Sequence, residues 1–207
     1  QRSGVSALDR DGQLTRRNHM HELEIWMDQC SGCHGADGEG NQAIGAPALT
    51  QLSSTYLARQ IRNFMSGVRG AHPGDKAGRS MAIAVSNLTP NEVTGLVSLL
   101  SKDLPPAFPA KTISGNTSRG KDFYVNLCSA CHGGNALGNE TLQAPALAGM
   151  NDWYLRNQYQ AFLKGLRGRH PEDLYGAQMA RLAPALSNRD DIEDVISYLA
   201  SLPARRF

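Results

Sequence analysis

Cysteine placement constrains this chain more than any other sequence feature. The four cysteines form two copies of one pattern, CSGCH at 30–34 and CSACH at 128–132. C-x-x-C-H is typical of covalent haem attachment, because two thiols one helical turn apart can each add to a vinyl group of one porphyrin. The adjacent imidazole then reaches the iron. The sequence predicts two c-type haems, with His34 and His132 as proximal ligands. The predicted attachment residues are Cys30, Cys33, Cys128 and Cys131.

Other uses of these cysteines explain less of the pattern. A single C-x-x-C is also compatible with a thioredoxin-like redox pair or with half of a zinc site. The two halves of such a zinc site usually lie about 15–20 residues apart, whereas Cys30 and Cys128 are 98 positions apart and each copy has its own histidine. Two structural disulfides would leave both histidines unexplained.

The 98-residue spacing extends beyond the two motifs and indicates an internal repeat. Matched pairs include Pro47/Pro145, Leu49/Leu147, Tyr56/Tyr154, Leu57/Leu155, Phe64/Phe162 and His72/His170. A chain of 207 residues suits two domains better than one. We expect an N-terminal arm at 1–18, domains at 19–102 and 117–207, and a Pro-rich linker at 103–116.

Hydrophobic spacing predicts that the first domain is helical. A helix is expected from about residue 19, because helical spacing relates Leu23, Trp26, Met27 and Cys30. The attaching cysteines are then expected at the end of this helix. A second helix is expected to begin with Ser53 or Ser54 as its N-cap. The pattern gives no strand signal in either half, so the predicted fold class is all-α.

Three further boundaries can be expected from loop, capping and periodicity signals. A loop is expected to extend to Arg79. Thr89 and Glu92, on either side of a proline, predict a capping box at the start of the next helix. The last helix of the second half is expected at 190–202, with a core face formed by Ile192, Val195, Ile196 and Leu199.

Charge and hydropathy narrow the classes of partner. The net charge is +2 before any cofactor is counted, and the propionates of two haems would make it negative. No basic excess therefore points to nucleic acid. No run of 18 or more apolar residues is present, so the sequence predicts no membrane-spanning helix.

The sixth iron ligand has two candidate types in each half. Of the six methionines, Met81 and Met179 coincide under the 98-residue shift. Among the histidines outside the motifs, His72 and His170 also coincide. Met ligation and bis-His ligation are both compatible with the repeat alone.

With these motifs the chain resembles two class I cytochrome c domains in tandem, similar to the di-haem cytochrome c4 family. The resemblance rests on the two C-x-x-C-H sites, the Ala-Pro-Ala-Leu loops at 46–49 and 144–147, and the Gly-x-Arg-Gly turns at 67–70 and 165–168. It also includes one methionine ahead of each last helix. It implies an electron-transfer protein with two haems near the domain interface and with Met81 and Met179 as sixth ligands.

Four further residues are candidates for contacts with the haems. The resemblance implies that the carbonyls of Pro47 and Pro145 orient the proximal histidines; the alternative is that both prolines only stiffen their loops. Arg69 and Arg167 occupy matching turns and are candidates to pair with haem propionates. The alternative for both arginines is a solvated surface position.

The resemblance favours a carrier that shuttles electrons between redox proteins such as a membrane complex, dehydrogenase, oxidase or reductase. It implies a bacterial periplasmic location, with possible peripheral association at the outer face of the inner membrane. The alternatives are a di-haem redox enzyme, for example in sulfur-compound oxidation, and a cytochrome subunit of a dehydrogenase. A catalytic haem needs a coordination position that substrate can reach, whereas both halves here offer a matched methionine.

Overall fold

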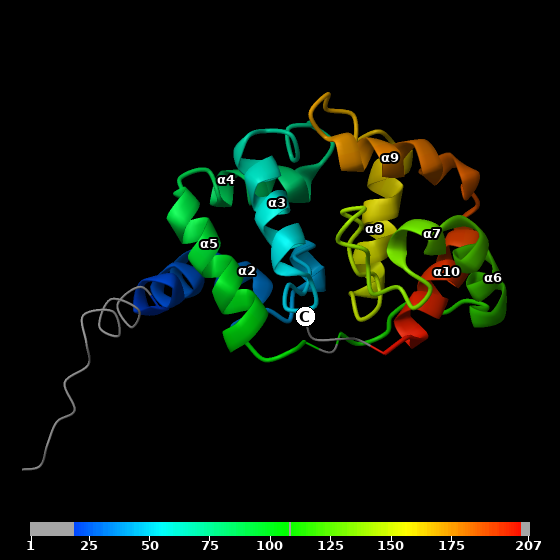
Figure 1. The fold of residues 1–207 in the computed structure, drawn as a ribbon, viewed down its shortest axis with the longest axis horizontal. Helices are drawn as coiled ribbons and strands as arrows, with labels where there is room; N and C mark the ends of the chain where they lie inside the picture. The colour runs from blue at the N-terminus through cyan, green and yellow to red at the C-terminus, as the bar shows by residue number, and fades with distance from the viewer. Residues whose placement is uncertain (1–18, 108, 204–207) are drawn as a thin grey trace, which may run out of the picture.

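The computed structural model describes residues 19–107 and 109–203, so the predicted arm at 1–18 lies outside the described residues. Two groups of helices lie side by side, with α3 and α8 facing each other at the centre (Figure 1). Within the described residues the only β pairing is two isolated bridges, Asn41–Ala46 and Asn139–Ala144. The predicted all-α fold class is confirmed. None of the described helices is both long and apolar enough to cross a bilayer.

The main helices follow the same order in the two halves, which differ in their short 3-10 and π segments. After helical residues 19–25, the first half contains the π-helix η1 (Trp26–Cys30), α2 (Ser31–His34), the 3-10 helix η2 (Gln42–Ile44), α3 (Ser54–Met65), α4 (Lys76–Ala84), α5 (Pro90–Ser98) and the π-helix η3 (Leu99–Asp103). The second half contains α6 (Thr117–Leu127), α7 (Ser129–His132), α8 (Asp152–Leu163), α9 (Leu174–Leu182), the 3-10 helix η4 (Ala183–Ala185) and α10 (Arg189–Ser201).

The capping signals in the sequence give two helix starts correctly. The Ser53 hydroxyl accepts a hydrogen bond from the Tyr56 N–H at 3.3 Å and caps α3. At α5 the Thr89 hydroxyl accepts from the Glu92 N–H, and the Glu92 carboxylate accepts from the Thr89 N–H at 2.7 Å. This is the predicted capping box.

The loop predicted to extend to Arg79 ends earlier. The Asp75 carboxylate accepts a hydrogen bond from the Gly78 N–H at 2.9 Å and caps α4, which begins at Lys76. Arg79 and Met81 therefore lie on a helix. The predicted loop was too long because the Asp75 cap was not recognised in the sequence. Gly78 lies inside α4, where an added Cβ would clash with the Asp75 carboxylate.

The buried stripe of the first helix is narrower than its sequence pattern predicts. Trp26 is buried and its indole N–H donates to the Ala36 carbonyl at 2.9 Å, but Met27 is 52% exposed. Val125, at the matching position of α6, is 51% exposed. This position faces solvent in both halves, so Met27 is a surface methionine. Tyr124 matches Trp26 and donates to the Gly133 carbonyl at 2.5 Å.

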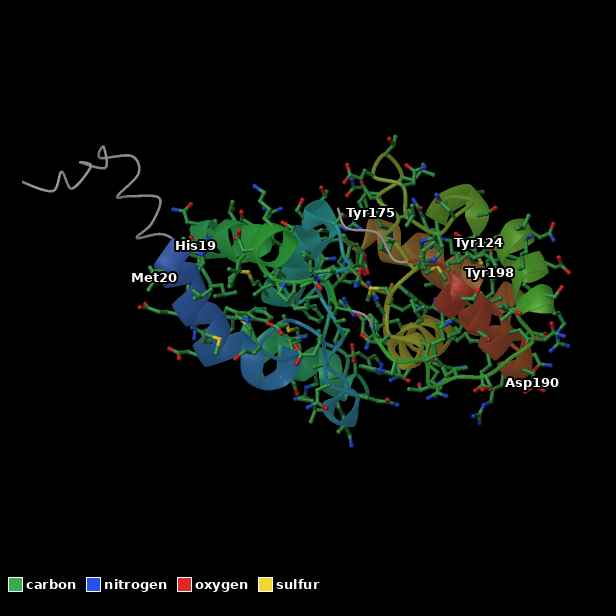
Figure 2. The ribbon with its side chains drawn as sticks, turned by 90° about the horizontal axis from the view of Figure 1, so that it is seen from below. His19, Met20, Tyr124, Tyr175, Asp190 and Tyr198 are labelled. Carbon is green, nitrogen blue, oxygen red and sulfur yellow. The ribbon has the colours of Figure 1, made fainter. Side chains whose placement is uncertain are left out.

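The terminal helices of the second half cross closely. An added Cβ at Gly120 on α6 would lie 2.0 Å from the Asp194 carbonyl oxygen on α10, so only glycine fits there. The rings of Tyr124 and Tyr198 lie 5.6 Å apart beside this crossing (Figure 2). Figure 2 also shows Met20 at the opposite, outer end of the first half.

The two halves differ at two turns where the chain adopts left-handed backbone. In the first half Gly38 and Gly45 have φ of 69° and 74°, and their counterparts Ala136 and Gln143 have φ of 58° and 56°. A non-glycine residue in this region is strained by about 1 kcal/mol or more. Arg59 of the first half donates to the Gln143 backbone carbonyl at 2.7 Å and also contacts its side chain. The interface therefore stabilises the strained turn.

The linker at 103–116 forms hydrogen bonds with both halves. The Ala107 N–H donates to the Thr50 hydroxyl at 2.9 Å. Farther on, the Thr112 hydroxyl and the Ile113 N–H donate to the carboxylate of Asp152, each at 2.7 Å. Asp152 is only 1% exposed, so its carboxylate is satisfied by the linker rather than by water.

We expect the replacement Asp152→Asn to destabilise the protein by about 1–3 kcal/mol at pH 7. Burial alone raises the pKa of Asp152, but hydrogen bonds from Thr112, Ile113 and Trp153 outweigh it and lower the pKa below its ordinary value. A depressed carboxyl pKa contributes stability above about pH 4 that is lost as the pH falls through the folded-state value. Urea unfolding at pH 7 and pH 3 measures this.

The matched control is Asp122→Asn, because Asp122 is an exposed acid of the same half. We expect it to change the free energy of unfolding by less than about 0.5 kcal/mol at either pH. An Asp152→Asn variant that loses as much stability at pH 3 as at pH 7 would contradict the assignment of the effect to the ionised carboxylate.

Candidate haem sites

The cysteines lie at the start of each half, where the first helix meets the short helices α2 and α7. Cys30 and Cys128 are half-buried, and Cys33 and Cys131 are exposed. Burial, with a smaller contribution from the neighbouring thiol, raises the pKa of Cys30 and of Cys128 to about 11. Reactive redox cysteines have lowered pKa values. This environment therefore disfavours the thioredoxin-like alternative.

Each motif histidine is buried and oriented by a backbone carbonyl. His34 Nδ1 donates to the Pro47 carbonyl at 2.8 Å, and His132 Nδ1 donates to the Pro145 carbonyl at 2.9 Å. Burial lowers the pKa of both imidazoles, and the hydrogen bonds offset this only partly. Each ring is thus a neutral imidazole with its Nε2 lone pair available to a metal.

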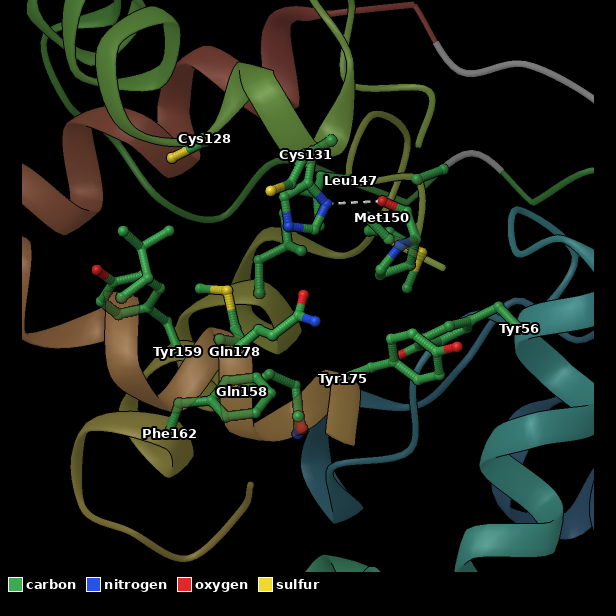
Figure 3. Close-up of a pocket in the computed structure, with 18 of the residues that line it drawn as sticks. Tyr56, Cys128, Cys131, Leu147, Met150, Gln158, Tyr159, Phe162, Tyr175 and Gln178 are labelled. Atoms are coloured by element: carbon green, nitrogen blue, oxygen red, sulfur yellow. Dashed lines mark hydrogen bonds between the residues drawn. The ribbon is translucent and has the colours of Figure 1, made fainter. Parts of the chain in front are cut away.

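A large cavity opens beside the second motif (Figure 3). Its free space is about 1420 Å³, counted with the solvent at its open side. Cys128, Cys131 and His132 lie on its wall. The apolar lining from the second half includes Leu147, Met150, Leu155, Phe162, Leu182, Leu186, Ile192, Val195, Ile196 and Leu199. The first half contributes Leu52, Tyr56, Arg59 and Gln60.

The two types of candidate sixth ligand lie in different surroundings. Met179 lines the same cavity as His132, and Met81 packs with Cys30 against the first core. His72 and His170 are exposed, and their Nδ1 atoms accept hydrogen bonds from the loop N–H groups of Gly74 and Glu172 at 3.0 and 3.2 Å. Neither of these histidines lines the cavity.

Arg69 and Arg167 do not occupy solvated surface positions. Arg69 is 8% exposed, and the Nε atoms of both arginines are buried. Both guanidinium groups lie between the halves and bind Gln60 and Gln158. These glutamines were not among the residues predicted from the sequence. The available signal was their coincidence under the 98-residue shift, which the arginines share.

Comparison with known proteins decides the family. The cytochrome c family model matches residues 24–102 and 117–203. The chain belongs to the cytochrome c family. It is 32% identical over 184 residues to a thiosulfate dehydrogenase electron acceptor of Thiomonas intermedia, covering 84% of this chain and 78% of the relative. It is 28% identical over 182 residues to cytochrome c4 of Stutzerimonas stutzeri, covering 84% of each.

The solved structure of reduced recombinant cytochrome c4 from Pseudomonas stutzeri has the same fold. It aligns with a TM-score of 0.66 and 21% identity over 89% of this chain and 98% of that one. The chain thus has the fold of cytochrome c4, and its two cytochrome c regions make it a di-haem c-type cytochrome. It carries two covalently bound haems and transfers electrons.

The residues of the cytochrome fit the haem. The thiols of Cys128 and Cys131 and the oriented imidazole of His132 lie together on the wall of the cavity in the second half. The rest of that wall is mainly apolar. Arg167, Tyr56 and Gln60 add polar groups to the wall. The buried Nε atoms of Arg69 and Arg167 have no hydrogen-bond acceptor among the described residues. Haem supplies both an apolar ring and carboxylates, which matches this combination of surfaces. Its iron supplies the one-electron chemistry.

Proposed function

We propose that this cytochrome is an electron carrier that passes single electrons between redox proteins and does not itself transform a substrate. The observation that carries the proposal is the duplication of one site. His34 with the Pro47 carbonyl and His132 with the Pro145 carbonyl form hydrogen bonds of 2.8 and 2.9 Å. A catalytic specialisation would be expected to break this symmetry at one iron.

We further propose the axial pairs His34/Met81 and His132/Met179. The cavity lining supports the second pair, because it includes both His132 and Met179. The exposed positions of His72 and His170 disfavour bis-His ligation. A thioether ligand raises the haem reduction potential. Two filled axial positions suit a carrier, because its ligation need not change with oxidation state.

The proposed domains are 19–102 and 117–207, joined by the linker at 103–116. Contacts between them support electron transfer within one molecule. The Asn151 side-chain oxygen accepts a hydrogen bond from the Ala48 N–H at 2.7 Å in a buried position. Met150 belongs to the buried core of the first half and also lines the cavity of the second. Such a fastened interface suits a shuttle that holds two electrons.

The proposed partners are a donor and an acceptor of the dehydrogenase, oxidase or reductase type, in the bacterial periplasm or at the outer face of the inner membrane. The name of the Thiomonas relative, a thiosulfate dehydrogenase electron acceptor, supports a dehydrogenase as donor. The same relative favours a second candidate, a lasting cytochrome subunit of such an enzyme. Copurification with a dehydrogenase at constant stoichiometry would distinguish the subunit from the free carrier.

The carrier proposal predicts a specific pattern in rapid-mixing experiments. Both irons should exchange electrons with small redox proteins, because each is held in a complete ligand set. The reduced native protein should not bind carbon monoxide, and neither thiosulfate nor peroxide should give steady turnover. Turnover that depends on substrate at one haem would contradict the proposal and favour the enzyme alternative.

A further inference from the structure

A closed ring of hydrogen bonds joins the two halves where α3 faces α8. Three side chains of each half, at the 98-residue spacing, form this interface ring: Tyr56, Gln60, Arg69, Tyr154, Gln158 and Arg167. Arg69 donates to Gln60 of its own half and to Gln158 of the other half, both at 2.8 Å. Arg167 donates to Gln158 at 2.8 Å and to Gln60 at 3.0 Å. Each amide oxygen therefore bridges both guanidinium groups.

The tyrosines cross the interface in the same exchanged manner. Arg69 Nη2 donates to the Tyr154 hydroxyl and Arg167 Nη2 donates to the Tyr56 hydroxyl, each at 3.1 Å. Burial raises the pKa of Tyr56, but Arg167 and Arg69 outweigh it and lower the pKa below its ordinary value. The positive charge of the ring thus stabilises the ionised form of Tyr56. This residue of α3 also lines the cavity of the second half (Figure 3).

The ring holds two positive charges without an ion-pair partner in the described part of the chain. The salt bridges there involve other cations. The buried Asp173 favours the charged form of Arg167 through space, but its carboxylate accepts from the Gly176 N–H and caps α9. Burying unpaired charge is costly. Both Nε groups are buried without an acceptor, so the ring has donors for two further anionic groups, one at each arginine.

The position of the ring beside the second motif suits haem carboxylates as these anions. Arg167, Gln60, Gln158 and Tyr56 line the cavity that holds Cys128 and His132. The repeat relates Arg69 to the first motif in the same way. Because every guanidinium group binds amide oxygens of both halves, neither charge belongs to one half alone. The interface ring is a centre shared by the two haem sites.

We propose that the interface ring couples the two haems, so that each arginine sets the reduction potential of both irons. This inference rests on the proposed two-haem carrier. A positive charge close to an iron stabilises the ferrous form, and such interactions are strong in a buried, low-dielectric interface. Removing either charge should therefore disfavour reduction at both sites. Arg69 and Arg167 are positioning residues in this scheme, since they act on the irons through the haem carboxylates.

The test is a redox titration that follows the signals of each haem separately by NMR in Arg69→Gln and Arg167→Gln proteins. We expect each variant to shift the reduction equilibrium of both haems toward the ferric form by about tenfold, which is about 59 mV for a one-electron couple. The matched control is Arg62→Gln, an exposed arginine on α3, which should shift neither haem by more than about threefold. A shift confined to the haem of the substituted half would overturn the proposal.

The variants Arg69→Lys and Arg167→Lys separate charge from packing. Lysine keeps the positive charge but cannot bridge both amide oxygens with a planar fork. We expect their potentials to stay near the parent values while their melting temperatures fall. Lysine variants that shift as far as the glutamine variants would contradict the coupling. Failure of the carrier proposal would instead appear in the unsubstituted protein, as carbon monoxide binding or substrate turnover.

Discussion

Alanine at both Cys30 and Cys33 is expected to halve the haem content of the protein. Each C-x-x-C-H motif supplies two thioether bonds to one porphyrin, so a half without its thiols retains no haem after denaturation. Acid extraction followed by intact-mass measurement should show two haems on the parent protein and one on the Cys30→Ala/Cys33→Ala variant. The remaining haem should resist extraction, because Cys128 and Cys131 are unchanged.

The matched variant Cys128→Ala/Cys131→Ala provides the control. It should also keep one haem, and peptide mapping should locate that haem on 30–34 in this variant and on 128–132 in the other. Extraction of both porphyrins from the parent protein would contradict covalent attachment. So would a double variant that keeps two covalent haems.

Motifs with a strict local chemistry could be predicted from the sequence. The capping box at Thr89 and the buried face of the last helix each depend on spacings of a few residues, which can be read directly from the sequence. The last helix was expected at 190–202 and runs over Arg189–Ser201, and its predicted face of Ile192, Val195, Ile196 and Leu199 is buried. Local hydrogen bonding and periodicity are enough for such features.

Features that need both halves could not be predicted in the same way. From the sequence, Arg69 and Arg167 are equally compatible with a contact to a propionate and with a solvated surface position. The charge of a residue alone does not reveal whether it is buried. The structure shows that each guanidinium reaches an amide about 90 to 110 residues away, Gln158 from Arg69 and Gln60 from Arg167. Pairing of α3 with α8 creates this ring, and no property of either helix alone requires that pairing.

The same reasoning applies to the strained turn at Gln143. A glutamine in place of the glycine found at 45 gives no sign of left-handed backbone in the sequence. Arg59, on α3 of the other half, binds the backbone carbonyl of Gln143 and so compensates for the missing glycine. Its counterpart under the repeat is Asn157, which shows that the two halves use the interface unequally.

Replacing Met81 or Met179 by alanine is expected to remove one sulfur–iron bond without removing a haem. The oxidised parent protein should show the weak red absorption band of sulfur-to-iron charge transfer, and each single variant should lose about half of its intensity. The potential of the affected haem should fall, because the thioether that stabilises ferrous iron is gone. Each variant should also bind carbon monoxide at one iron, since a coordination position becomes free.

Histidine variants decide between the two ligand types. His72→Ala and His170→Ala should leave the red band and the reduction potentials unchanged. Both side chains are exposed, and each accepts a hydrogen bond from a backbone N–H of its own loop. Met27→Ala is the control for losing a methionine, since Met27 is 52% exposed. If the double variant Met81→Ala/Met179→Ala kept the parent spectrum while a His72 or His170 variant changed it, the irons would be bis-His ligated. The half-buried Met81 and Met179 would then only pack against the cores, where an unbranched side chain fits readily.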